Sequence, residues 1–145
     1  MAEVLCDSGD CGNSNVVIEF EPKLKVACVR WTGDVSLQTL RREYEKFRTL
    51  PEVAGLKAVI VDFSHAQKVQ LSCNDISAFS QDSAIFPPGF PRVFIGPKDL
   101  QFGLLRMYQT LAGDPRDGTC VVRTMDEAYA ALGLTEPVFQ PPVQL

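Results

Sequence analysis

The sequence predicts an α/β domain in which a mostly parallel sheet of about five strands is covered by helices. After two opening β-rich runs, strand-like and helix-like segments alternate along the chain, which is the pattern of a parallel sheet with crossover helices. The run LKAVIVDF at 56–63 is almost wholly apolar, as in a strand buried on both faces. The predicted order is β-β-α-β-α-β-α-β-α, with about four helices and one antiparallel edge strand.

Local patterns predict the first strands and the first helix. The runs at 15–22 and 23–33 are rich in β-branched residues and meet at a proline-bearing turn, so we expect an antiparallel hairpin. The segment 34–50 is predicted to be an amphipathic helix with Asp34 or Ser36 as its N-cap. Its apolar residues recur at spacings of three and four, at Leu37, Leu40, Tyr44 and Phe47.

Two later helices are marked by capping-box spacing at their first residues. Ser72 and Asp75 stand three apart before a short helix that is expected to stop at Pro87. Thr124 and Glu127 have the same spacing after the last predicted strand. Each pair lets a side chain and a backbone N–H bond reciprocally at the helix start.

The remaining helix follows a predicted strand at 91–96. Gly96 is expected to cap it, with Pro97 at its first position and Asp99 in its first turn, because each of these residues favours a helix start at that place. Gly133 is expected to end the last helix of the chain.

Length and composition indicate one globular domain. The chain has 145 residues, of which 46% are hydrophobic and 22% charged, and this length is close to the commonest domain size. We expect the domain to span residues 15–134, between a flexible N-terminal tail, 1–14, and a proline-rich C-terminal tail, 135–145.

Charge and hydropathy exclude several classes of partner. A net charge of −4 argues against nucleic acid, which requires a concentrated basic surface. The N-terminus lacks the features of a secretory signal, and no apolar run reaches the length of a membrane span. The sequence therefore predicts a cytoplasmic protein without membrane insertion.

The cysteines and glycines match no common cofactor motif. Cys28 and Cys120 lie within apolar runs, where a free thiol is usually buried. Cys6 and Cys11 have four residues between them and no histidine nearby, so they do not have a common zinc spacing. The glycines lack the spacing of a nucleotide-binding loop. We expect neither a metal nor a cofactor.

Two stretches, VIVDFSHAQKV at 59–69 and GPKDLQFGLLRMYQTL at 96–111, carry a family resemblance. Together with the element order, they resemble the STAS-like (SpoIIAA-like) superfamily, which includes bacterial anti-anti-sigma factors. The resemblance covers roughly residues 16–133. It implies a STAS-like fold and a non-enzymatic, protein-binding or regulatory role.

The resemblance also bears on phosphorylation. Anti-anti-sigma factors carry an Asp-Ser-Ser-Gly motif at a helix start, and its first serine is phosphorylated. Aligned from Asp62, that motif falls on 70–73, where Leu71 takes the place of the phosphorylated serine. Ser72 is the candidate phosphoacceptor, although its spacing to Asp75 predicts that it acts mainly as a helix cap.

Two kinds of site could lie at the carboxyl ends of the parallel strands. Asp62, His65, Lys98 and Arg123 are candidates for a small anionic ligand, because strand ends and helix N-termini gather there. An enzyme would instead need a cleft where Asp62, His65 and Cys73 converge. His65 is the only histidine, and no G-x-S-x-G motif accompanies it, so we expect no catalytic residues. Cys73 lies where a helix dipole would lower a thiol pKa, whereas Asp75 would oppose thiolate formation.

The helix at about 97–112 has apolar residues around most of its circumference, so one sheet cannot cover it. The alternatives are packing by the C-terminal tail or a neighbouring helix, a homodimer or partner surface, and an apolar ligand pocket. We expect Leu100, Leu104, Tyr108 and Leu111 to face the sheet. The candidate interface residues are Phe102, Leu105 and Met107.

The sequence therefore predicts a STAS-like module that binds proteins, with a homodimer as its simplest assembly. The first alternative is a carrier or sensor of a small apolar or anionic ligand, and the second is an enzyme. A deep apolar cavity would favour the carrier, whereas an open cleft with converging polar side chains would favour the enzyme.

Overall fold

The computed structural model describes residues 15–82, 86–87, 89–112 and 118–141. The five strands of its main sheet are β1 (Val16–Glu21), β2 (Val26–Trp31), β4 (Ala58–Asp62), β6 (Arg92–Ile95) and β7 (Thr119–Val122). Two short strands are β3 (Val35–Ser36) and β5 (Val69–Gln70). The helices are α1 (Leu37–Arg48), α2 (Cys73–Ser80), α3 (Asp99–Ala112) and α4 (Met125–Leu132), with a 3₁₀ turn η1 (Pro51–Gly55).

The main sheet confirms the predicted α/β class. Its strand order is β1-β2-β4-β6-β7, in which β1 and β2 are antiparallel and every other neighbouring pair is parallel. The antiparallel strand β1 lies at the edge, as the opening hairpin predicted. The described residues form four α-helices, and these alternate with the strands after β2.

The predicted element order was incomplete in two places. Strands β3 and β5, of two residues each, pair in parallel and form a second small sheet beside the first. The 3₁₀ turn η1 begins at Pro51, in the connection between α1 and β4. Elements this short contain too few residues for a periodic pattern, so the sequence did not reveal them.

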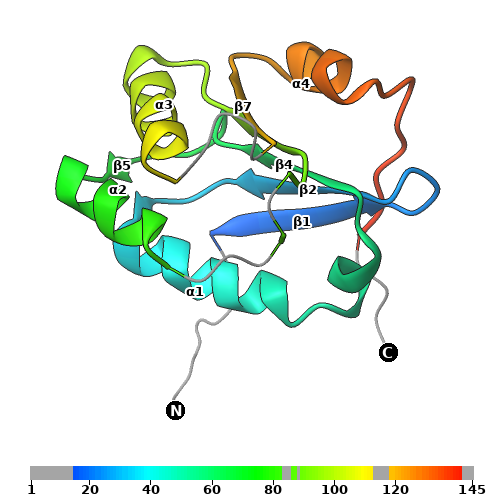
Figure 1. The fold of residues 1–145 in the computed structure, drawn as a ribbon, viewed down its shortest axis with the longest axis horizontal. Helices are drawn as coiled ribbons and strands as arrows, with labels where there is room; N and C mark the ends of the chain where they lie inside the picture. Colours follow the sequence, from blue (N-terminus) through cyan, green and yellow to red (C-terminus); the bar gives the residue numbers. More distant parts are fainter. Residues whose placement is uncertain (1–14, 83–85, 88, 113–117, 142–145) are drawn as a thin grey trace.

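Helices cover both faces of the sheet, as Figure 1 shows. Helices α1, α2 and α3 lie on one face, and α4 lies on the other with the C-terminal segment beside it. The alternation along β4 shows the division, because Val59 packs in the core on the α1 side and Ile60 in the core on the α4 side. This arrangement explains why β4 is apolar almost throughout.

Three of the helices begin with a capping box, as two of them were predicted to do. The Ser72 hydroxyl accepts from the Asp75 N–H at 3.1 Å, and the Asp75 carboxylate accepts from the Ser72 N–H at 2.9 Å. Thr124 and Glu127 do the same for α4. For α1 the cap is Ser36, the second of the two predicted candidates.

The predicted C-terminal tail packs against the domain over the part that the structure describes. Gln140 exchanges two backbone hydrogen bonds with Phe20 on the outer edge of β1, and the ring of Phe139 stacks on Tyr129 of α4. The Val138 N–H donates to the carboxylate of Glu21. This hydrogen bond, with a second from Lys23, holds the pKa of Glu21 below its usual value. The predicted N-terminal tail, with Cys6 and Cys11, lies outside the described residues.

No helix in the described part of the chain combines the length and the apolar character needed to span a bilayer.

Candidate functional site

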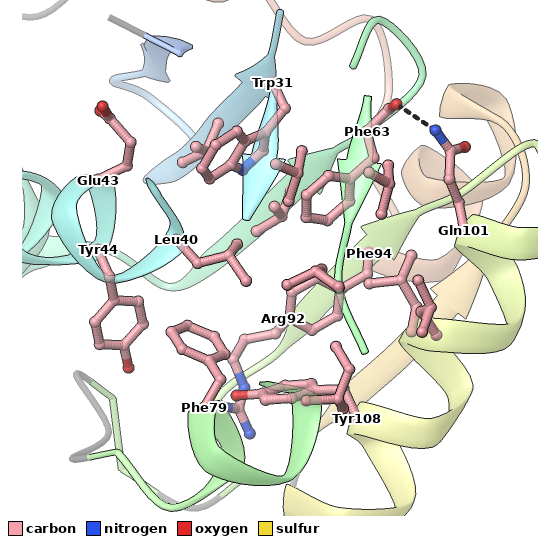
Figure 2. Close-up of a pocket in the computed structure, with 18 of the residues that line it drawn as sticks. Trp31, Leu40, Glu43, Tyr44, Phe63, Phe79, Arg92, Phe94, Gln101 and Tyr108 are labelled. Carbon is pink, nitrogen blue, oxygen red and sulfur yellow. Dashed lines mark hydrogen bonds between the residues drawn. The ribbon is translucent and has the colours of Figure 1, made fainter. Parts of the chain in front are cut away.

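The most prominent feature of the described structure is an apolar cavity between the sheet and helices α1, α2 and α3. Its volume is about 140 Å³, and Figure 2 shows the side chains around it. Nearly all of its lining is carbon. The lining residues are Val29, Trp31, Val35, Leu40, Glu43, Tyr44, Phe47, Val59, Val61, Phe63, Val69, Leu71, Ile76, Phe79, Phe86, Arg92, Phe94, Gln101, Leu104, Leu105 and Tyr108.

Three residues on neighbouring parallel strands form the floor of this cavity. Val29, Val61 and Phe94 lie side by side on three neighbouring strands, and all three face the helices. The two valines have short side chains, so they do not extend far from the sheet toward the helices. The space between them remains where larger residues would have filled it.

Aromatic rings form the wall of the cavity on the side of α2. The Phe79 ring lies 5.5 Å from that of Tyr44 on α1 and 5.7 Å from that of Tyr108 on α3. Tyr108 in turn contacts Phe94 edge to face at 5.7 Å. The rings therefore connect three helices and the sheet around one space, with geometries that aromatic pairs favour.

The other end of the cavity is closed by Trp31, Phe63 and Gln101. The Trp31 ring stacks on Phe63 with centroids 5.9 Å apart. Gln101 is 5% exposed, and its amide nitrogen donates to the Phe63 carbonyl at 3.1 Å. Its amide oxygen accepts from the Lys98 N–H at 3.2 Å. Gln101 thereby fixes the start of α3 against the end of β4 with its polar atoms satisfied.

Two charged residues contribute to the lining, Glu43 from α1 and Arg92 from β6. Glu43 of α1 is 3% exposed, and its Oε2 lies 3.2 Å from Arg42 Nε and 3.7 Å from Lys46 Nζ. Its carboxylate points away from the middle of the cavity (Figure 2). Arg92 is half-buried and enters the cavity from the first residue of β6.

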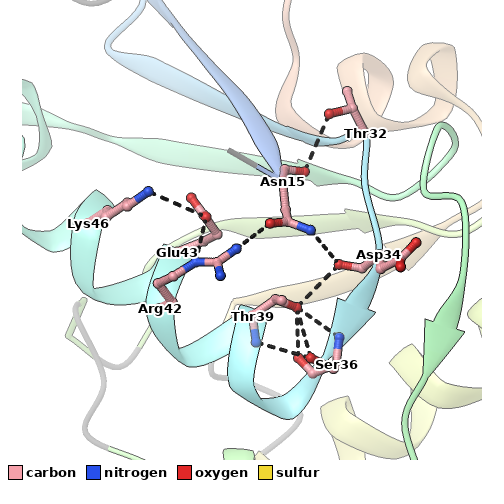
Figure 3. A network of polar contacts seen from close by, with 8 residues as sticks. All are labelled: Asn15, Thr32, Asp34, Ser36, Thr39, Arg42, Glu43 and Lys46. Carbon is pink, nitrogen blue, oxygen red and sulfur yellow. Dashed lines mark hydrogen bonds and ion pairs between the residues drawn. The ribbon is translucent and has the colours of Figure 1, made fainter. Parts of the chain in front are cut away.

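A polar network holds the Glu43 side of α1 in place, as Figure 3 shows. Asn15 donates to the Asp34 carbonyl at 3.0 Å and accepts from the Arg42 guanidinium. The Thr39 hydroxyl contacts both Ser36 and the Asp34 carbonyl. The network ties the start of β1 to the first turns of α1, so the helix face that lines the cavity has a fixed orientation.

The predicted anionic site at the strand ends is divided among separate contacts. Asp62 is 3% exposed, with one carboxylate oxygen 3.7 Å from Arg30 Nε and the other accepting from the Ser64 N–H at 2.9 Å. His65 is exposed, and its Nδ1 lies 3.1 Å from the Ser64 hydroxyl. Asp62 and His65 therefore both contact Ser64, Asp62 at the backbone N–H and His65 at the hydroxyl.

Of the two predicted cationic residues of that edge, Arg123 makes local contacts and Lys98 is exposed. Arg123 donates to the Asp99 carboxylate at 2.9 Å and to the Pro97 carbonyl at 3.2 Å. Its guanidinium lies 4.2 Å from the centre of the Phe102 ring. The side chain of Lys98 is exposed. At the strand ends, Asp62, His65 and Arg123 are thus each engaged in local contacts.

Cys28 and Cys73 lie in opposite environments. Cys28 is 1% exposed beneath α4, and burial raises the pKa of its thiol to about 12. Cys73 is exposed at the first residue of α2, directly after the Ser72 cap. Both hydrogen bonds of the capping box join Ser72 to Asp75, so Cys73 has no part in it. A thiol as buried as Cys28 is chemically inert.

Helix α3 is rotated from its predicted orientation and starts two residues later than Pro97. Leu100 and Leu111 were expected to face the sheet, but they are 63% and 43% exposed. Leu104 and Tyr108 do face inward as expected, but Gln101 and Leu105 accompany them in place of Leu100 and Leu111. Because Gln101 is buried at the helix start, the side of α3 that faces inward is shifted by one residue from the predicted side. The spacing of apolar residues could not reveal this, because it does not count a glutamine as buried.

The predicted interface residues of α3 lie in three different settings. Leu105 faces inward and lines the cavity. Phe102 is half-buried beneath the Arg123 guanidinium, and Met107 is half-buried. Helix α3 packs against α2 and β7, so a neighbouring helix provides part of its cover. The C-terminal segment packs with α4 on the opposite face.

Arg92 and Gln101 were missed as site residues by sequence reasoning. One signal for Arg92 was present in the strand RVFI, where Arg92 and Phe94 share a face. A charged residue on the inner face of a strand between two neighbours is uncommon and usually has a partner. For Gln101 the only signal was a polar residue flanked by the apolar residues Leu100 and Phe102.

No protein-family model matches this chain, and no curated protein matches it. Within the described ranges, no group of three or more His, Cys, Asp or Glu side chains is placed to hold a metal ion.

Proposed function

We propose that this protein is a non-enzymatic module of the STAS-like type that binds one small apolar molecule, as a carrier or sensor. The observation that carries the proposal is the cavity of about 140 Å³ lined by aliphatic and aromatic side chains. An apolar cavity of about 150 Å³ in another protein stays dry and binds benzene. A ligand about the size of one aromatic ring would therefore fit this cavity.

The lining favours an apolar occupant over water. A buried water requires two to four polar partners, whereas this lining is almost wholly carbon. The polar atoms of Gln101 already bond to Phe63 and Lys98. The aromatic wall of Tyr44, Phe79 and Tyr108 provides ring faces and edges for a planar ligand.

Two further observations support the non-enzymatic role and the STAS-like type. The Asp62 carboxylate is engaged with Arg30 and the Ser64 N–H. This supports a non-enzymatic role, since a catalytic His65 would need a carboxylate or similar group to orient its ring. The STAS-like type is supported by the sequence resemblance and by the opening hairpin followed by parallel strands and helices.

Ligand titration tests the proposal, with Trp31 as a built-in reporter. Trp31 is the only tryptophan of the chain and lines the cavity. Toluene and benzene are expected to produce a saturable change in its emission and to raise the midpoint of thermal unfolding, because a ligand that binds only the folded state stabilises it. The Val61→Phe variant is expected to lose both responses, because the larger ring occupies the cavity floor.

The control makes the same substitution at an exposed position. Val17 of β1 is 44% exposed and does not line the cavity, so Val17→Phe is expected to bind as the native protein does. Emission that never saturates, or equal binding by Val61→Phe and the native protein, would contradict a ligand site in the cavity.

A second candidate function is self-association through α3, as a STAS-like protein-binding module. Leu100 and Leu111 project from this helix and are 63% and 43% exposed, and a two-fold contact would cover both in each chain. We expect the native protein to sediment as a dimer at micromolar concentration and Leu100→Glu to shift it toward monomer.

Two controls accompany this sedimentation test. Helical content of Leu100→Glu is measured by circular dichroism, so that loss of folding is distinguished from loss of contact. Val138 is equally exposed, at 63%, but lies beyond α4, so Val138→Glu is expected to sediment as the native protein does. A native chain that is monomeric throughout would rule out self-association.

A further inference from the structure

We infer that the ligand of the cavity is a small apolar acid, whose anionic group pairs with Arg92 while its apolar body fills the space beneath α1, α2 and α3. This inference rests on the proposed function and adds the chemical class of the ligand. It starts from the position of Arg92 on the inner face of the sheet.

The sheet register places the Arg92 side chain in the cavity. Arg92 pairs with Val59 on β4 and with Thr119 on β7, so it lies between two neighbouring strands and not at the edge. It lies on the same face of the sheet as Phe94, two residues later, which is the face covered by α1, α2 and α3. Both residues line the cavity. In Figure 2 its side chain reaches toward the end of the cavity where Phe79 and Tyr108 lie.

Arg92 contributes a cationic group to the lining at this end. Arg92 is the one cationic residue among the lining residues that the structure describes, and Glu43 is the one anionic residue. The Glu43 carboxylate pairs with Arg42 and Lys46 and points away from the cavity. An entering anion would therefore meet Arg92 without a carboxylate directed at it from Glu43.

A guanidinium recognises a carboxylate with high specificity. Its planar fork matches the two carboxylate oxygens, and charge-assisted hydrogen bonds of this kind are about twice as strong as neutral ones. Five N–H donors allow the group to bind a ligand while it keeps a contact within the protein. The apolar surroundings strengthen the pairing, because little water competes for the charges.

The size of the cavity limits the apolar body. About 140 Å³ corresponds to a single aromatic ring or a branched aliphatic chain of similar volume. Benzoate and phenylacetate are the simplest probes of this class. Their amides, benzamide and phenylacetamide, have nearly the same shape without the charge.

The test compares each acid with its amide by calorimetry and Trp31 emission, at a pH well above the pKa of the acids. The native protein is expected to bind each acid at least about tenfold more tightly than its amide. Arg92→Met is expected to abolish that preference while neutral benzene still binds, and Arg92→Lys is expected to retain part of it. Arg123→Met removes an arginine that lies outside the lining, so it is expected to keep the preference.

The outcomes separate this inference from the function on which it rests. Benzene and the amides binding as tightly as the acids would overturn the acidic ligand and leave the apolar site intact. A preference for acids that persists in Arg92→Met would assign the anion to another group and would likewise overturn the inference. If neither acids nor neutral probes bind the native protein, the proposed function fails together with it.

Discussion

Replacing Trp31 by alanine is expected to lower the free energy of unfolding by about 3 to 5 kcal/mol, the usual cost of removing a large buried aromatic side chain. Trp31 is 3% exposed and stacks on Phe63 at the end of β4. Its removal deletes this contact and joins the vacated volume to the existing cavity, which makes the cost of the void larger. Urea unfolding followed by far-ultraviolet circular dichroism measures the change.

The conservative variant Trp31→Phe provides the comparison, because it keeps a ring against Phe63. It is expected to lose much less stability than Trp31→Ala. The enlarged cavity of Trp31→Ala should also accept naphthalene, which is too large for the native space. Equal stability of the alanine variant and the native protein would show that Trp31 does not hold this end of the core.

Substitution of Gly118 by alanine is expected to destabilise the protein by more than about 2 kcal/mol, for two separate reasons. Its φ of +95° is strained for any residue with a side chain, at a cost of about 1 to 3 kcal/mol. An added Cβ would also lie 2.3 Å from the Phe90 carbonyl oxygen. The Gly118 carbonyl accepts from the Arg92 N–H at 2.9 Å, so displacement of this residue disturbs the strand that carries Arg92.

The same substitution at Gly103 is the matched control. Gly103 lies within α3, where an added Cβ meets no atom within 4 Å. Alanine there is expected to stabilise the protein by up to about 1 kcal/mol, because alanine favours the helix. Thermal and urea unfolding of both variants measure the difference. Similar stabilities of the two variants would contradict the role of Gly118 in the turn before β7.

The sequence predicted the fold where its signals are local or strongly periodic. The capping boxes at Ser72 and Thr124 have fixed spacing, and Gly133 ends α4 in the left-handed conformation expected of it. The strand β4 was identified because burial on both faces leaves an apolar run. Each of these features depends on residues close in sequence.

The sequence offered an apolar pocket only as one alternative beside the helix at 97–112 and could not locate the cavity, because a cavity is a property of how distant side chains fit together. Val29, Val61 and Phe94 are widely separated along the chain, and only the register of three strands brings them together. The same limit applies to the orientation of α3, which depends on the bonds of Gln101 to Phe63 and Lys98. Apolar periodicity indicates that a residue is inside, but it does not show whether the space beside it is filled.

The segment that pairs with β1 also bears on how the folded chain avoids aggregation. An edge strand offers unpaired N–H and C=O groups to the strands of other molecules and can seed fibrils. Here Gln140 occupies part of the outer side of β1 through its two bonds to Phe20, and Pro141 follows with no N–H to offer. The chain thus caps its own antiparallel edge with a segment that is a poor template for a further strand.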